Sequence, residues 1–293
     1  MRSLILPAIA ALLILPQISI AAPKPPISLP KTSKWEMNYD EDSCHLMAKF
    51  GEGKQSTIIR MTRYQPSDWF DLSVYGEPFK HFGTTKPVRV AYGNQAPRRI
   101  EAITGESGNG LPLLIINGQR LDGWSAQKEG DKPPIISPAQ EAAAAAIDLD
   151  LVAGKNYRLE SGSLGAPFAA MRRCTDDLLR KWGYDPGQQA SLSQSAMPTK
   201  PPSGWLNDSD YPDKSIMDGH NGLVQFRLDI DAAGAVAGCY VLHRTNPDDF
   251  ADLTCRLIRQ RAKFSPALDR DGKPVKSFFI SKVRFVIPER RLH

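Results

Sequence analysis

The stretch LVQFRLDIDAAGAVAGCYVLH, residues 223–243, decides the fold of the last third of the chain. Its first eight residues alternate between two faces. One face carries Val224, Phe226, Leu228 and Ile230, and the other carries Leu223, Gln225, Arg227 and Asp229. This alternation predicts a β-strand with one face packed in a core and the other face in water.

A hairpin and a helix are predicted after this strand. Asp231–Gly234 places a glycine where positive φ is expected, so the chain turns into an antiparallel strand over Val236–His243. Apolar residues recur at helical spacing over Asp248–Lys263, and a last strand is expected over Lys276–Ile287. The inward stripe of the helix should hold Phe250, Leu253, Thr254, Leu257, Ile258 and Arg261, with Cys255 at its margin. A small sheet with one helix on it is therefore predicted.

Several short motifs in this region occur in a recognisable order. They are Tyr211-Pro212, Gly219, Gly222, Asp231 to Gly234, Cys239, Phe264-Ser265-Pro266-Ala267 and Gly272-Lys273-Pro274-Val275. Together they resemble the C-terminal domain of the TonB family over residues 205–288. The resemblance implies a small β-β-α-β domain, and the pair Cys239 and Cys255 is similar to that of a subgroup of exported TonB-family proteins.

The resemblance also implies a function for the last strand. In the family this domain lies in the periplasm and grips a short extended peptide of outer-membrane receptors by strand addition. An edge strand suits this because its unpaired amide and carbonyl groups can bond an added strand. The partner-binding residues implied are Lys276, Phe278, Ile280, Lys282, Arg284 and Val286. Ordinary sheet pairing or a homodimer interface is the alternative for the same residues.

The N-terminus reads as an export signal. Arg2 is followed by an almost wholly apolar run over Leu4–Ile20, and small residues precede a cleavage point expected after Ala21. An uncleaved inner-membrane anchor is the alternative, but the run is about 17 residues long and holds two prolines, against about 20 residues needed to span. A periplasmic location is therefore expected, with residues 22–32 as an extended leader without fixed structure.

Residues 33–186 are predicted to form a mainly antiparallel β domain. Strand character occurs at Thr57–Arg63, Phe70–Tyr75, Val88–Tyr92 and Leu111–Ile116. A helix should begin at the capping box of Ser137 and Gln140, and a second should run over Pro167–Trp182. The polar residues 187–204 are the expected linker, so the fold class is α+β with two domains.

Four cysteines in an exported chain should form disulfides, because the compartment is oxidising and no CxxC or His-Cys cluster suggests a metal. Four cysteines allow three pairings. Pairing within domains gives Cys44 with Cys174 and Cys239 with Cys255, and Cys174 lies on the inward stripe of its helix.

Neither a cofactor nor a nucleic-acid partner is expected. The net charge of +5 is mild, and the basic residues do not cluster with aromatic residues. The five histidines lack metal-ligand spacing. The run 105–110 misses the Gly-x-Ser-x-Gly elbow, and Ser125-Ala126-Gln127-Lys128 lacks the partner motifs of a Ser-x-x-Lys enzyme.

The sequence thus favours a non-enzymatic envelope protein that binds another protein, either an outer-membrane receptor or a different envelope protein. A membrane-anchored energy transducer is one alternative, although 18 linker residues reach at most about 60 Å. An exported hydrolase that uses the first domain is the other alternative.

Overall fold

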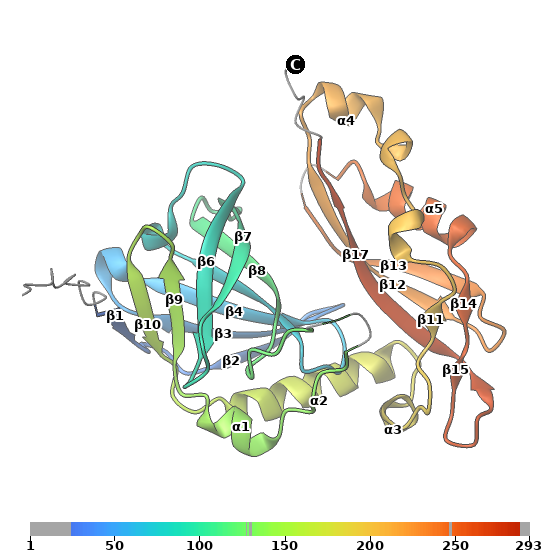
Figure 1. The fold of residues 1–293 in the computed structure, drawn as a ribbon, viewed down its shortest axis with the longest axis horizontal. Coiled ribbons are helices and arrows are strands. Elements are labelled where there is room, and N and C mark those ends of the chain that lie inside the picture. Colours follow the sequence, from blue (N-terminus) through green and yellow to red (C-terminus); the bar gives the residue numbers. More distant parts are fainter. Residues whose placement is uncertain (1–24, 127, 129–130, 246–247, 288–293) are drawn as a thin grey trace, which may run out of the picture.

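A computed structural model describes residues 25–126, 128, 131–245 and 248–287, and the predicted signal peptide lies outside them. The fold is α+β, with a large curled sheet and a smaller sheet beside it (Figure 1). Separate hydrophobic cores belong to the two parts. No helix among the described residues has both the length and the apolar character needed to cross a membrane.

The first domain is built on a ten-stranded sheet in the order β1-β10-β9-β6-β7-β8-β5-β4-β3-β2. The strands are β1 Ile27–Pro30, β2 Glu36–Tyr39, β3 Cys44–Phe50, β4 Thr57–Arg63, β5 Phe70–Tyr75, β6 Thr85–Tyr92, β7 Arg98–Glu106, β8 Pro112–Gln119, β9 Ile147–Leu151 and β10 Asn156–Glu160. Neighbours are antiparallel apart from β1 and β10, which are parallel. The predictions for β4 and β5 match residue for residue, while β6 and β8 extend beyond the predicted segments.

The expected leader contains one of these strands, so its prediction as a segment without fixed structure was wrong. Residues Ile27–Pro30 pair with Tyr157–Glu160, and Leu29 is buried in the core. Lys31 then forms an isolated bridge with Phe50 of β3. The proline and lysine content concealed the strand because β1 lies at the end of the sheet order, where a proline amide needs no partner.

Two helices cover one side of the first domain. The predicted capping box is present, because Ser137 accepts a hydrogen bond from the Gln140 amide and starts α1, Pro138–Ala143. Helix α2, Gly165–Lys181, runs along the base of the large sheet toward the second domain (Figure 1). A disulfide joins Cys174 of α2 to Cys44 of β3 with a Cα–Cα distance of 6.0 Å, which is the pairing predicted.

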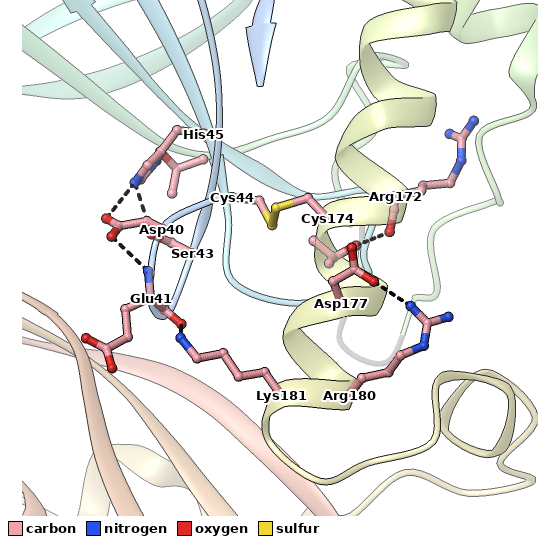
Figure 2. Close-up of a disulfide and its surroundings, with 12 residues drawn as sticks. Asp40, Glu41, Ser43, Cys44, His45, Arg172, Cys174, Asp177, Arg180 and Lys181 are labelled. Carbon is pink, nitrogen blue, oxygen red and sulfur yellow. Dashed lines mark hydrogen bonds and ion pairs between the residues drawn. A yellow bond between two sulfur atoms is a disulfide. The ribbon is translucent and has the colours of Figure 1, made fainter. Parts of the chain in front are cut away.

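Polar contacts flank this disulfide (Figure 2). The Lys181 ammonium donates a hydrogen bond of 2.8 Å to the carbonyl of Glu41. On the sheet side, His45 lies between Ser43 and Asp40. These contacts and the covalent bond hold the C-terminal half of α2 against the β2–β3 turn.

The second domain contains a three-stranded sheet in the order β13-β12-β17, with α5 on one face (Figure 1). Its elements are α3 Pro186–Ala190, β11 Met197–Pro198, α4 Asp213–Met217, β12 Gly222–Ile230, β13 Val236–Arg244, α5 Ala251–Arg261, β14 Phe264–Ser265, β15 Ala267–Leu268, β16 Pro274–Val275 and β17 Ser277–Phe285. Short 3-10 helices lie at Gly53–Gln55, Glu77–Phe79, Pro202–Gly204 and Asp208–Asp210. The second disulfide joins Cys239 of β13 to Cys255 of α5.

The stripe predicted for α5 is mostly correct. Phe250, Thr254 and Ile258 are buried, whereas Arg261 does not point into the core as predicted. Its guanidinium instead pairs with Asp210, and the shortest N···O distance is 2.5 Å. A charged group at the end of the stripe gains more from an exposed carboxylate than from burial without one.

The segment expected to be the linker lies against the second domain. Strand β11 pairs with β14, Gln194 forms a bridge with Leu268, and Ala196 is buried in the second core. Trp205 is buried in the same core, against Phe264 and Phe279.

Candidate partner-binding edge

Strand β17 forms one edge of the small sheet. Its nine residues pair with β12 from Ser277 opposite Ile230 to Phe285 opposite Gly222. Among the described residues, no strand pairs with its other edge. The backbone along that edge is therefore positioned to accept a further strand.

The register divides the side chains of β17 between two faces. Phe279 and Val283 lie opposite Leu228 and Val224, and they pack with the core beneath α5. The residues predicted to bind a partner lie in the alternate set and face the first domain. Phe278 contacts the rings of Trp182 and Tyr184 at centroid distances of 6.0 and 5.2 Å, and Ile280 lines a cavity between the domains.

The other predicted residues lie before, within and beyond β17. The Lys276 ammonium precedes the strand and donates to the carbonyl of Gly183 at 3.0 Å. The Lys282 ammonium lies 3.4 Å from Asp71 of β5. Arg284 and Val286 are exposed at the far end. Three of the six predicted side chains, those of residues 276, 278 and 282, thus already contact the first domain.

The face of β12 predicted to stay in water is covered. Gln225 is 7% exposed and Arg227 is 4% exposed. The Arg227 guanidinium lies 4.2 Å from the ring centroid of Trp182 and 4.3 Å from that of Tyr240, and it pairs with Asp229 at 2.9 Å. The prediction was wrong because alternation shows which residues share a face but not whether another domain covers that face.

Residues 182–184 make most of this contact, and the sequence analysis did not single them out as a functional group. Trp182 ends α2, and the Tyr184 hydroxyl donates to the carbonyl of Ser277 at 3.0 Å. Burial raises the pKa of Tyr184, so the hydroxyl stays protonated and able to donate. The available signal was the pair of aromatic residues around Gly183, directly after the predicted helix.

Hollows adjoin β17 along its whole length. One of about 310 Å³ lies between Trp205, Tyr211 and residues 281–286. A second of about 440 Å³ adjoins residues 277–280, with Leu179 and Gln189 on its other side. A third of about 300 Å³ lies between the domains beside residues 280–282. Space for an added chain is therefore continuous from residue 277 to residue 286.

The motifs considered for catalysis do not form a catalytic arrangement. The Ser107 hydroxyl bonds Asn109 and the carbonyl of Leu111 within its own turn. Ser125 and Lys128 lie outside any regular element. Among the described residues, no three His, Cys, Asp or Glu side chains are placed to hold a metal ion.

A serine, a histidine and an aspartate do meet in the second domain. Asp249 accepts from Ser215 Oγ at 2.8 Å and contacts His220 Nδ1 at 2.7 Å, and the His220 and Ser215 hydrogen bonds lower the pKa of Asp249. Because both partners contact the carboxylate, no base activates the hydroxyl. The group instead ties the turn before β12 to the start of α5.

Comparison with known proteins agrees with the geometry of the second domain. A family model described as the Gram-negative bacterial TonB protein C-terminal matches residues 207–287. No curated protein matches the chain. Domains of this family are non-enzymatic and interact with other proteins of the cell envelope. Residues 207–287, which hold the β13-β12-β17 sheet and α5, are therefore a TonB family C-terminal domain.

Proposed function

We propose that this protein is exported to the periplasm and binds an extended peptide of an envelope partner, such as an outer-membrane receptor. The peptide adds to the outer edge of β17 as a fourth strand. The first domain holds the small sheet in place and forms one side of the binding site.

The observation that carries the proposal is the one-sided pairing of β17. Nine residues pair with β12, and hollows adjoin the strand from residue 277 to residue 286. Main-chain groups of an edge strand give affinity for an extended peptide, and alternate side chains give selectivity. The residues proposed to carry the selectivity are Phe278, Ile280, Lys282, Arg284 and Val286, with Lys276 at the start.

The contact between the domains argues against a transducer that reaches across the periplasm. Such a transducer needs its C-terminal domain at the end of a long extended segment. Here Tyr184 and Lys276 hold the start of β17 at the end of α2, and residues 194–198 pack on the second domain. The intact mass of the protein from its native envelope separates these alternatives, because a mass that begins at Ala22 supports release and a full-length, membrane-held mass supports a transducer.

Selection of peptides tests the proposal. A random nonapeptide display library is passed over the chain from Ala22 onward, and captured sequences are synthesised for titration. Successive residues of a strand direct their amides to opposite edges. Ser281→Pro and Arg284→Pro therefore each remove an amide, one on either edge of β17.

One of these two variants should keep the pairing with β12, and it should melt like the parent while losing peptide capture. Ala237→Pro is the matched control, because residue 237 lies on the opposite edge strand and has no partner in the β12–β13 register. Undiminished capture by both β17 variants would overturn strand addition. A self-associating chain whose dimer is lost in the same variants would show that β17 pairs with a second copy instead.

A further inference from the structure

A buried arginine between the two domains lacks a counter-ion. Arg63 ends β4 and is 3% exposed, and its guanidinium lies 4.8 Å from the ring centroid of Phe168. Its Nε has no hydrogen-bond partner among the described residues. No described carboxylate lies within ion-pair distance of its guanidinium. A buried guanidinium without hydrogen bonds is costly, and a bound anion would offset that cost.

The acids around Arg63 are already engaged. Burial lowers the pKa of Arg63 to about 10, so the group is still charged at neutral pH, and Asp68 and Glu141 act on it through space. Asp68 accepts from the Ile136 amide at 3.1 Å, and one oxygen of Glu141 pairs with Arg172. The other Glu141 oxygen is buried without a partner and makes no bond with Arg63.

Arg63 lines the cavity of about 300 Å³ that separates the β4–β5 turn from β17. Trp69 and Asp71 complete the wall of the first domain, and Gln225, Ile280 and Lys282 form the wall of the second. Asp71 is satisfied within the structure, because it accepts from the Gly118 amide at 2.8 Å and pairs with Lys282. The remaining donors in the cavity favour an anion over a cation.

The position of the cavity indicates where that anion comes from. Ile280 and Lys282 lie on the face of β17 that points toward the first domain. Side chains of a strand added to β17 alternate between the two faces, so every second one points to the same side as these residues. A side chain of moderate length on that side would reach the cavity opening.

We infer that the cavity between the domains is a carboxylate-binding site, in which Arg63 receives an aspartate or glutamate side chain of the peptide added along β17. This inference rests on the proposed function. It gives the first domain a direct part in recognition, because partners with an acidic residue at one register position are selected over neutral ones. Two charge-assisted hydrogen bonds to an arginine give a planar, directional preference for a carboxylate.

The first arm of the test needs no peptide. The chain from Ala22 onward, labelled with ¹⁵N at arginine Nε, is titrated with N-acetyl-glutamate N′-methylamide and with the glutamine analogue. We expect the Arg63 Nε–H resonance to move with the glutamate compound alone. Arg60 is the internal control, because it lies on the same strand, stacks on Tyr75 at 5.4 Å and also has an unpartnered Nε, yet it does not line the cavity.

The second arm uses a captured nonapeptide and versions in which each acidic residue is replaced by its amide. We expect one replacement to weaken binding by about tenfold or more, the range of a charge-assisted hydrogen bond. Arg63→Met should abolish that difference, whereas Arg60→Met should keep it. Melting curves report whether the variants fold, and if Arg63→Met does not fold, the resonance shift decides.

The two arms separate failure of this inference from failure of strand addition. Peptides captured along β17 with equal affinity for acid and amide forms would overturn the carboxylate site and leave the proposed function standing. A shift of Arg63 without any captured peptide would support the anion site and remove the peptide as its source. An unmoved Arg63 resonance together with acid-independent peptide binding rejects the site altogether.

Discussion

The hydroxyl of Tyr184 donates a hydrogen bond of 3.0 Å to the carbonyl of Ser277, and so joins the end of α2 to the first residue of β17. Ser277 is 3% exposed, and its own hydroxyl donates to Gln189 at 2.6 Å. The edge strand thus starts at a fixed point on the first domain. The orientation of β17 is set by contacts that lie outside the matched family domain, because residue 184 precedes residue 207.

Removal of the Tyr184 hydroxyl should weaken the contact between the domains. Tyr184→Phe leaves the ring against Phe278 but leaves the buried carbonyl of Ser277 unpaired, so we expect a loss of about 1 kcal/mol in the free energy of unfolding. Denaturant titration measures the change. The control is Tyr39→Phe, because Tyr39 is 52% exposed. Equal stability of both variants would show that the hydrogen bond does not contribute.

Arg227 should hold the two domains together through its two aromatic neighbours. Arg227→Met keeps much of the side-chain volume but removes the charge between Trp182 and Tyr240. A desolvated cation–π contact contributes about 2 kcal/mol. We expect the radius of gyration from small-angle scattering to grow while the family domain stays folded. Arg244→Met on the exposed end of β13 is the control, and an unchanged radius for Arg227→Met contradicts the prediction.

Acid should destabilise the first domain through His45. Burial, followed by the charge of Arg60, lowers the pKa of His45 below its ordinary value of 6.5. Because the unfolded chain binds this proton more readily, the stabilising contribution is present above about pH 6.5 and is lost as the pH falls through the folded-state pKa. His45→Gln should flatten the pH dependence of the melting temperature between pH 7 and the acid side. The same slope in the variant would rule out His45 as its source.

The two disulfides should differ in their contributions. Cys44 and Cys174 are 130 residues apart, whereas Cys239 and Cys255 are 16 apart. Chain entropy gives upper values of about 5 and about 3 kcal/mol for loops of these sizes. Paired Cys→Ser variants measured by denaturant titration should therefore rank in that order. A larger loss for the short loop would indicate that strain or residual structure, not loop entropy, sets the difference.

Local sequence patterns predicted the elements of both domains well. The strand Thr57–Arg63 and the capping box of Ser137 depend on side-chain alternation and on a hydrogen bond three residues away, which a single sequence displays. The pairing of Cys44 with Cys174 followed from assigning each cysteine to a domain and one of them to an inward helix face.

The contacts between domains could not be predicted in this way. Arg227 lies at a position that reads as water-facing, and only the placement of Trp182 shows that it is covered. Arg63 reads as an exposed end of a strand, yet α2 and the second domain enclose it. Long-range packing decides these environments, and a periodicity along the chain does not report it. For the same reason, the candidate edge was located by resemblance, while its enclosure by the first domain became visible only in the structure.

Hydrogen exchange of β17 tests the central claim most directly. The chain from Ala22 onward is exchanged with and without a captured nonapeptide, and amide protection is read by mass spectrometry over residues 277–286 and over β13. The account predicts slower exchange along β17 and unchanged exchange along β13, because an added strand bonds the free amides of one edge alone. Protection of β13, or saturating peptide without any added protection of β17, would contradict strand addition at this edge.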